Sequence, residues 1–233
     1  MVFASHIKNG KRLIQKKNRR EYLKLKTRFY DYMSIIISAD EIKKKLPNYS
    51  PDKAEDFHHE SATKADKSFT KALKESPYKD VILLNGGTAS GKTEFLVTQL
   101  INRDCIIMDA TLSTELGARN KIRQVIKAKK IPIVYTIIPD DLRRAFIAFL
   151  NRDRKFDDSH FYKTHSGSRK TLLWIASNYP DMDINIIESS YTSAQMLQFS
   201  QIKFDNRRKL IKYLNDKQMT ESAIIKYVNF INK

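Results

Sequence analysis

Short apolar runs alternate along this chain with longer segments in which apolar residues recur three and four positions apart. The runs have the length of buried strands, and the spacing between them is that of one helix face. Alternation of this kind is typical of an α/β protein with a mostly parallel sheet. Strands are expected within residues 33–38, 81–84, 105–108, 132–139 and 183–188, and helices within 51–76, 92–100, 114–130 and 140–154.

Both ends of the chain differ from this alternating middle. Residues 1–30 have a patchy helical stripe and many basic side chains, which predicts a basic helical extension on the surface. Residues 201–233 contain two helical stripes and predict a tail packed on the same domain. We therefore expect a P-loop NTPase-type, three-layer α/β/α domain over residues 31–200, extended by helices at both ends.

Composition supports a globular, helix-rich protein. The 233 residues are 41% hydrophobic, with six glycines and six prolines, which is enough for one α/β domain with a sizeable core. The single cysteine, Cys105, lies in an apolar run and cannot form an internal disulfide, which favours a buried thiol in a reducing compartment. No run approaches the roughly 20 apolar residues of a spanning helix, so we expect no membrane partner and a cytoplasmic location.

Charge is distributed unevenly along the chain. Lys and Arg number 43 against 26 Asp and Glu, a formal charge of +17, and ten of the basic residues lie within residues 1–30. Such an excess favours acidic partners, including nucleotides and nucleic acid, and the basic N-terminal region could contact a phosphate backbone. A solvated basic surface is the alternative interpretation.

The sharpest motif is a phosphate-binding loop, GxxxxGK[ST]. An apolar run, Val81–Leu84, precedes it, and a helical segment follows, which is the context such a loop requires. Backbone N–H groups and the positive end of the helix dipole then converge on one spot that binds phosphate. Lys92 is expected to reach the β- and γ-phosphates of ATP, and Thr93 to coordinate Mg²⁺. The predicted ATP-binding residues are Gly86, Gly87, Thr88, Ala89, Ser90, Gly91, Lys92 and Thr93.

Two other apolar runs also end in an aspartate. Asp40 follows three isoleucines, and Asp109 follows Cys105-Ile-Ile-Met. The carboxyl ends of parallel strands border the crevice in which open sheets bind ligands. Asp40 is therefore either a general base or the cap of a short helix over 41–46 that ends at Pro47. Asp109 is a ligand of Mg²⁺ or of the acceptor, or has a structural role.

Three arginines flank a polar segment, residues 155–168, that is expected to be a flexible loop. Planar guanidinium groups stabilise charge on a transferred phosphoryl group, so Arg152, Arg154 and Arg169 could act as a lid over it; surface positions are the alternative. On the helix expected over 51–76, His58, His59 and Glu60 diverge too strongly to share one metal ion. A substrate-facing His59 or Glu60 is one possibility, and a solvated helix face is the other.

These segments together resemble zeta-toxin-type P-loop kinases, and zeta-like effector kinases of plant pathogens that act on a dinucleotide are a second relative. The resemblance covers roughly residues 32–190 and lies in the loop, in the Asp40 segment seven residues before Pro47, and in the strand ending at Asp109. It implies that Asp40 is the base, that Glu60 or Asp66 supplies a substrate-binding acid, and that Asp109 and Thr111 form an acid-x-Thr strand end. In zeta toxins, however, the Asp-Pro-Tyr segment follows the phosphate loop, whereas here it precedes the loop.

The sequence therefore predicts an ATP- and Mg²⁺-dependent kinase that phosphorylates a hydroxyl of a nucleotide sugar or related nucleotide. A role as a toxin with an antitoxin partner is part of this hypothesis. A polynucleotide 5′-hydroxyl kinase is an alternative that the basic charge favours. An ATP-gated nucleic-acid-binding protein is a third hypothesis, from a different functional class.

Overall fold

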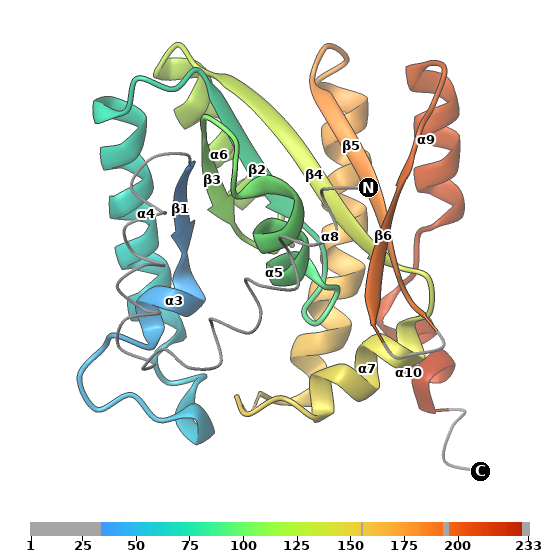
Figure 1. Cartoon of the computed structure of the whole chain (residues 1–233). Helices are drawn as coiled ribbons and strands as arrows, with labels where there is room; N and C mark the ends of the chain where they lie inside the picture. The colour runs from blue at the N-terminus through green and yellow to red at the C-terminus, as the bar shows by residue number, and fades with distance from the viewer. Residues whose placement is uncertain (1–33, 155, 193–195, 230–233) are drawn as a thin grey trace, which may run out of the picture.

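A computed structural model describes residues 34–154, 156–192 and 196–229 (Figure 1). The predicted basic helices of residues 1–30 lie outside these ranges. The described chain is an α/β protein built on one six-stranded sheet. No helix in the described ranges is long and apolar enough to cross a membrane.

The sheet is parallel except at one edge. Its order is β1-β3-β2-β4-β5-β6, where β1 to β5 run parallel and β6 pairs with β5 in antiparallel orientation. The mostly parallel sheet predicted from the apolar runs is confirmed, whereas β6 was not predicted, because it contains no continuous apolar run. The strands are β1 (Ser34–Ser38), β2 (Asp80–Asn85), β3 (Cys105–Asp109), β4 (Ile131–Pro139), β5 (Asp183–Tyr191) and β6 (Leu197–Ile202).

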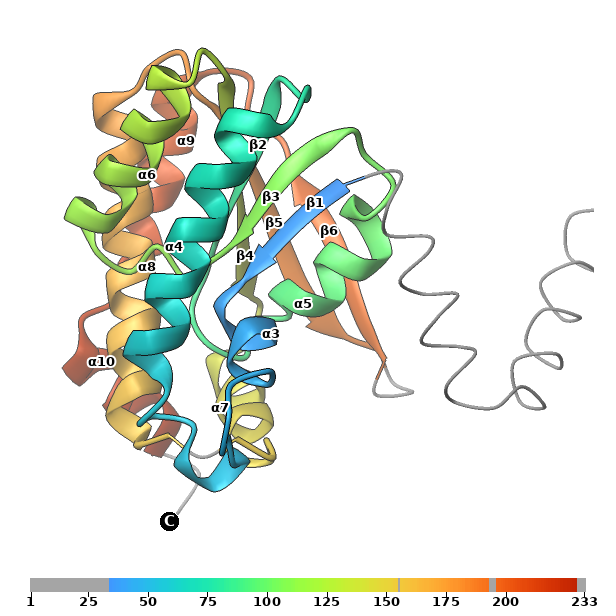
Figure 2. The ribbon, with the colours of Figure 1, turned by 90° about the vertical axis from the view of Figure 1, so that its left-hand side faces the viewer.

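Helices cover the two faces of the sheet unequally (Figure 2). One face packs against α4 (His58–Glu75), α6 (Glu115–Lys127), α8 (Asp158–Asn178) and α9 (Arg207–Asp216). The other face packs against α5 (Lys92–Phe95) and the π-helical turn η2 (Leu96–Leu100). These layers confirm the predicted three-layer architecture.

Alternate residues of the same strand enter different cores. Val81 and Leu83 of β2 join the large core beneath α4, α6 and α8, while Ile82 and Leu84 join the smaller core beneath α5. This is the pattern of a central strand buried on both faces, and it explains the continuous apolar run. A third cluster joins α7 (Leu142–Leu150) to the start of α8 and to α10 (Glu221–Asn229).

The prediction of a loop at residues 155–168 is wrong for most of that segment, because helix α8 begins at Asp158 and continues to Asn178. Ser, Thr, His and Gly made this segment look like a loop, but the side chains of Thr164, His165 and Ser168 bond inside the helix or to the phosphate loop. Thr164 and Ser168, for example, donate to the carbonyls of Phe161 and His165. A helix with a polar buried face has no apolar stripe that a periodicity argument can detect.

The short helix after β1 also differs from its prediction. Helix α3 spans Ala39–Lys43, so Asp40 lies within its first turn and Ser38 occupies the cap position. The expectation that Asp40 caps a helix starting at residue 41 is therefore wrong, and its carboxylate is free for other contacts. The 3₁₀ turn η1 (Pro51–Lys53) leads from here to α4.

Candidate functional site

The phosphate loop joins the end of β2 to α5 at the carboxyl edge of the sheet. Gly86 and Gly91 have φ values of 137° and 88°, which favour glycine. The Lys92 ammonium donates to the carbonyl oxygens of Gly86 and Gly87, both at 2.8 Å. The side chain thus folds back over its own loop, where a phosphate-binding lysine is required.

Burial of the Lys92 side chain changes its pKa. Burial lowers the pKa of this ammonium to about 8, although the opposite charge of Asp109 raises it. An anionic ligand in the loop would replace the lost solvation, because an opposite charge at short range favours the charged form of a lysine.

The two predicted carboxylates lie beside each other at the ends of neighbouring strands. Ser38 of β1 is in register with Asp109 of β3, and its hydroxyl donates to the Asp109 carboxylate at 3.1 Å. Burial raises the pKa of Asp109, against the opposing charge of Lys92.

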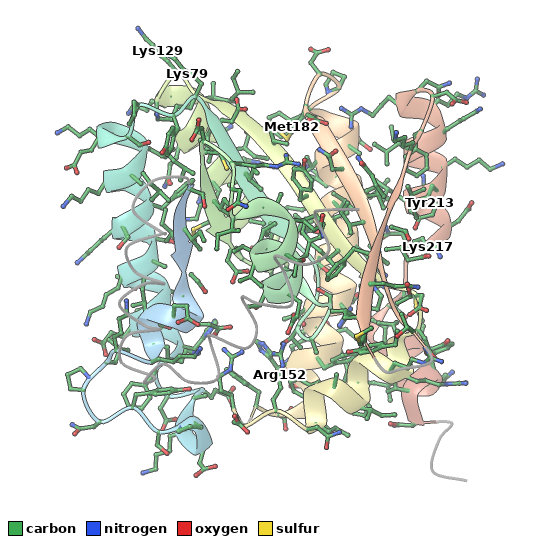
Figure 3. All side chains as sticks on the ribbon, viewed as in Figure 1. Lys79, Lys129, Arg152, Met182, Tyr213 and Lys217 are labelled. Carbon is green, nitrogen blue, oxygen red and sulfur yellow. The ribbon has the colours of Figure 1, made fainter. Side chains whose placement is uncertain are left out.

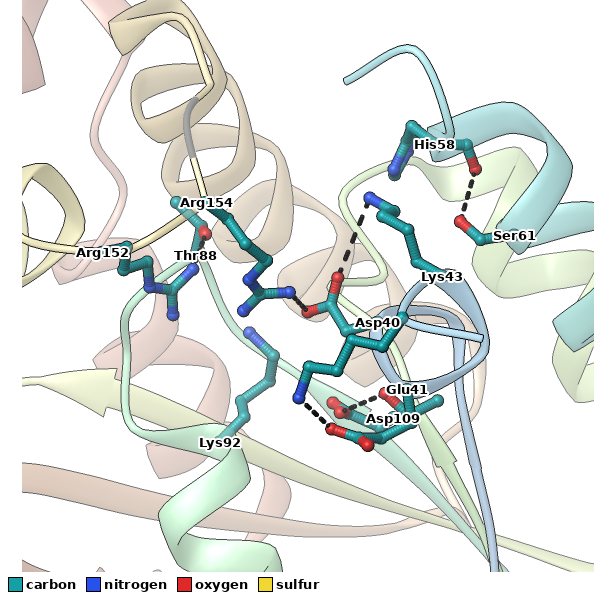
Figure 4. A network of polar contacts seen from close by, with 12 residues as sticks. Asp40, Glu41, Lys43, His58, Ser61, Thr88, Lys92, Asp109, Arg152 and Arg154 are labelled. Carbon is teal, nitrogen blue, oxygen red and sulfur yellow. Dashed lines mark hydrogen bonds and ion pairs between the residues drawn. The ribbon is translucent and has the colours of Figure 1, made fainter. Parts of the chain in front are cut away.

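Asp40 is surrounded by cations (Figure 4). Its carboxylate pairs with Arg154 at 2.5 Å and lies 3.9 Å from the ammonium of Lys43. Burial alone would raise the pKa of Asp40, but Arg154, Lys43 and Arg152 together hold it below its usual value. Asp40 is therefore ionised at neutral pH.

Arg152 connects this cationic group to the loop. It lies at the carboxyl end of the sheet, whereas Lys79 and Lys129 lie at the opposite end (Figure 3). The Arg152 guanidinium donates to the hydroxyl of Thr88 at 2.8 Å. From the segment that follows α7, Arg152 thus contacts the loop, and Arg154 contacts Asp40.

One cavity of about 500 Å³ contains most of these groups. It runs from the phosphate loop past both carboxylates to α4 and α6. Predicted site residues that line it are Asp40, Asp66, Thr88, Ala89, Ser90, Lys92, Thr93, Asp109, Thr111, Arg152 and Arg154. Gly86, Gly87 and Gly91 shape the loop without lining the cavity.

Three predicted residues lie elsewhere. Glu60 is exposed and pairs with Lys64 at 2.7 Å, and its neighbour His59 is also exposed. Arg169 is 8% exposed and lies behind the phosphate loop, where its guanidinium contacts His165. This position separates Arg169 from the cavity that holds the other two arginines.

Sequence reasoning missed an aromatic wall at the Asp40 end of the cavity. The rings of Phe156 and His160 stack with centroids 4.6 Å apart, and His58 meets both edge-on. Burial lowers the pKa of His160 to about 4, so this imidazole is neutral at physiological pH. The sequence predicted a helix at His58 and a loop at Phe156 and His160, and it could not show which elements meet at the cavity.

Lys43 is a second residue that the sequence did not single out. Its side chain is 1% exposed, and its ammonium has no hydrogen-bond acceptor among the described residues. It lies 4.9 Å from the centroid of the Phe156 ring, behind Asp40. Lys43 thus acts mainly as a buried positive charge close to the Asp40 carboxylate.

The oxygen donors in the cavity fit Mg²⁺. This ion prefers hard oxygen ligands, and protein sites usually supply only one or two of them, while phosphate and water supply the rest. Thr93 and Asp109 offer one hydroxyl and one carboxylate in the same cavity. Within the described ranges, no cluster of three or more His, Cys, Asp or Glu residues could hold a metal alone.

A scan of protein-family models and a search of curated proteins find no match to this chain. Among solved structures, the chain is similar to crystal structures of the AvrRxo1-ORF1:AvrRxo1-ORF2 complex. The structure with sulphate ions shows 12% identity over 74% of this chain and 75% of that chain, with a TM-score of 0.47. The native complex shows 13% identity over 77% of this chain and 86% of that chain, with a TM-score of 0.44. The structure with ATP shows 12% identity over 74% of this chain and 75% of that chain, with a TM-score of 0.42. These values are too low to transfer a function or a residue role to this chain.

Proposed function

We propose that this protein is a P-loop phosphotransferase that moves the γ-phosphate of ATP to a hydroxyl of a nucleotide sugar or related nucleotide. One observation supports this most strongly: two carboxylates, Asp40 in the first turn of α3 and Asp109 at the end of β3, share a cavity with the ammonium of a phosphate loop. A nucleotide-binding switch needs the loop alone, whereas transfer to an alcohol also needs a base near the γ-phosphate.

Each group in the cavity has its own role in this proposal. The loop amides and Lys92 bind the β- and γ-phosphates. Thr93 and Asp109 would hold Mg²⁺, which would neutralise charge on the phosphate oxygens. Arg152 and Arg154 stabilise the negative charge that develops on the transferred group.

In the transfer step Asp40 accepts the proton of the acceptor hydroxyl. The acceptor oxygen forms a bond to the γ-phosphorus as the bond to the β–γ bridging oxygen breaks, and ADP leaves with that electron pair. Asp109 is the alternative base, because its raised pKa gives it a greater affinity for a proton.

The part of the cavity beyond the carboxylates is the acceptor site in this proposal. It is bordered by Asp66 and Lys121, which pair at 2.5 Å across α4 and α6, and by the aromatic wall of His58, Phe156 and His160. Aromatic faces and paired charges suit the ring and polar groups of a nucleotide. A toxin activity and an antitoxin partner belong to the same proposal.

The test is transfer of labelled γ-phosphate to a pooled extract of nucleotides and nucleotide sugars, followed by identification of the labelled product by mass spectrometry. The Asp40→Asn and Lys92→Met variants are compared with wild type. We expect Asp40→Asn to bind ATP but to lose transfer by a factor of about 10² to 10⁴, which is the usual contribution of a general base.

Two results would decide against parts of this scheme. Full turnover by Asp40→Asn together with an inactive Asp109→Asn variant would move the base to Asp109. The absence of any labelled product with wild-type protein and the extract, despite ATP binding, would refute a small-molecule kinase.

A further inference from the structure

Thr88, the third residue of the phosphate loop, is bonded through all of its polar atoms to groups outside the loop. Its amide donates to the hydroxyl of Thr164 at 3.1 Å, and its carbonyl lies 2.8 Å from Nε2 of His165. Its own hydroxyl accepts from Arg152. Two consecutive residues of α8, Thr164 and His165, thus hold the two peptide groups on either side of Thr88 from behind.

The bond to Thr88 fixes the tautomer of His165. A carbonyl oxygen only accepts, so Nε2 carries the hydrogen and Nδ1 is left as an acceptor. Arg169 supplies the matching donor, since its guanidinium lies 3.3 Å from Nδ1 and also donates to the His165 carbonyl at 3.1 Å. Donation therefore runs in one direction, from Arg169 to His165 and from His165 to Thr88.

The imidazole is neutral in this arrangement. His165 is 0% exposed, and burial, followed by the charge of Arg169, lowers its pKa well below the usual value. The surrounding charges on the loop side, Lys92 and Arg152, act in the same direction. The donor at Nε2 is thus present throughout the physiological pH range.

The ring also contacts the loop directly. A β-carbon on Gly87 would lie 2.3 to 2.4 Å from three atoms of the His165 ring, so only glycine fits there. Position 87 is a variable position of the GxxxxGK[ST] motif, and the imidazole explains why glycine occupies it here.

The neighbouring backbone shows why such an anchor is needed. Ala89 has a φ of 59°, a left-handed conformation that is unfavourable for a residue with a β-carbon. Relaxation of Ala89 would rotate the preceding peptide and could turn the Thr88 carbonyl toward the cavity. An inward carbonyl would repel phosphate oxygens.

We propose that His165, held by Arg169, is a positioning residue for the phosphate loop: its Nε2–H keeps the Thr88 carbonyl out of the nucleotide site and so keeps the loop ready for ATP. The inference rests on the proposed function, because it assumes that the loop binds ATP.

The test compares direct ATP binding by calorimetry, and KM values for ATP, among full-length wild type, His165→Ala and His165→Gln. We expect His165→Ala to weaken ATP binding at least tenfold and to raise KM for ATP while leaving KM for the acceptor unchanged. His165→Gln should recover most of this loss, because its side-chain amide can donate from nearly the position of Nε2. Ser177→Ala, on the exposed part of the same helix, is the matched control and should bind as wild type does.

A second measurement does not depend on activity or on the folding of a variant. Nitrogen NMR of wild-type protein labelled at histidine should show His165 protonated at Nε2 and not at Nδ1 from about pH 5.5 to 8. In Arg169→Met the Nδ1 acceptor loses its donor, and we expect a mixture of tautomers together with weaker ATP binding.

Equal ATP affinity in wild type and His165→Ala would overturn the inference, as would an Nδ1-protonated tautomer in wild type. Equal losses in His165→Ala and His165→Gln would also overturn it, since that result indicates a role in packing alone. Failure of wild type to bind ATP would instead refute the proposed function, and the NMR tautomer would still report on the His165 contact.

Discussion

The two carboxylates that face the phosphate loop differ in their surroundings. Arg154 and Lys43 outweigh burial at Asp40 and lower its pKa, whereas burial dominates at Asp109 and raises its pKa. Opposite shifts in neighbouring groups are typical of sites that divide acid and base roles. Asp40 is therefore ionised before any ligand arrives, whereas Asp109 takes up a proton more readily than an exposed aspartate and Lys92 opposes this shift.

In the Arg154→Gln variant we expect the acidic limb of the kcat/KM profile to move to higher pH. With Arg154 present, the pKa of Asp40 lies below its usual value, and the base is ionised well into the acidic range. Without the guanidinium, burial becomes the larger influence and the pKa rises. Asp40 is then protonated at pH values where wild type still works, which kcat/KM measured against pH will reveal.

The control for this experiment is Arg144→Gln, which removes an exposed guanidinium from α7 and should leave the acidic limb in place. A lower rate in Arg154→Gln with an unmoved limb would show that Asp40 is not the titrating base.

Lys92 gives a second prediction at this scale, proton uptake on ATP binding. Its pKa of about 8 in the free protein leaves it half protonated at pH 8, and a triphosphate should raise that pKa toward or above the usual lysine value. Binding at pH 8 should then take up on the order of half a proton. Calorimetry in buffers of different ionisation enthalpy measures this number, and Lys92→Arg, which stays charged, should show no such uptake. Equal uptake in both proteins would assign the proton to another group.

The sequence was informative for residues whose roles depend on local spacing. The eight loop residues, Asp40 and Asp109 could be found because each follows directly from a strand. Lys43, Phe156 and His165 could not be found, because their roles depend on which elements meet around the cavity and the loop. His59 and Glu60 show the same limit, since a one-residue difference on a helix turns a side chain by about 100°.

At the scale of elements, helix α8 buries polar side chains such as Thr164, His165 and Arg169 as well as apolar ones. Gly167 lies in its middle because the helix crosses the backbone of Ser113 closely, and a β-carbon there would lie 2.3 Å from the Ser113 carbonyl. Glycine is therefore required by contact, although it weakens the isolated helix.

We expect Gly167→Ala to lower the free energy of unfolding by about 1 to 3 kcal/mol, the usual cost of overpacking. Helix propensity alone would give a gain of about 1 kcal/mol, so the sign distinguishes the two effects. Denaturant unfolding measures the difference, and Lys170→Ala on the exposed face is the control. A stabilised Gly167→Ala variant would mean that α8 can shift away from Ser113 without cost.

The end of β2 has a comparable polar contact in Asn85, which is 0% exposed. Its amide nitrogen lies 3.3 to 3.4 Å from the carbonyl oxygens of Thr111, Leu112 and Ser168, and its oxygen accepts from Thr136 at 2.5 Å. One side chain thus ties β2, β4, α8 and the loop after β3 together beneath the phosphate loop.

Asn85→Ala should cost about 3 kcal/mol of stability, because it removes the acceptor of the buried Thr136 hydroxyl and a donor shared by three carbonyl groups. Denaturant unfolding of this variant is compared with that of Asn178→Ala, which removes an exposed amide that bonds only within its own helix. We expect Asn178→Ala to change stability by less than about 0.5 kcal/mol. Similar values for both variants would show that Asn85 is not a structural anchor.

At the scale of the whole molecule, the order of the chain and the order of the sheet need not agree. Strand β1 precedes the phosphate loop in sequence but lies beside β3, so that Asp40 and Asp109 reach the same cavity. Periodicity predicted the strands, and the end of each strand predicted a carboxylate, but neither predicts neighbours in a sheet. That information is carried by long-range packing, such as the contact of Phe69 on α4 with the main core.

The distribution of charge over the molecule leads to the last prediction. Residues 1–30 hold ten of the 43 basic residues, whereas the described residues that line the cavity all lie between Ser38 and Thr164. Replacement of Lys16, Lys17, Arg19 and Arg20 by glutamine should therefore leave kcat/KM for a small acceptor within about twofold of wild type. Any affinity for single-stranded oligonucleotide should fall, and the slope of log K against log salt should decrease by about 0.7 for each phosphate that is no longer neutralised.

The same variant separates the proposed function from the two nucleic-acid alternatives. A polynucleotide kinase needs its substrate held by phosphate contacts, so label transfer to a 5′-hydroxyl oligonucleotide should fall with the affinity. An ATP-gated binding protein would lose its main activity and have no small acceptor to retain. Retained phosphorylation of the small acceptor, measured alongside weakened oligonucleotide binding, fits only the proposed function, because only there does the chemistry depend on the cavity and not on the basic segment.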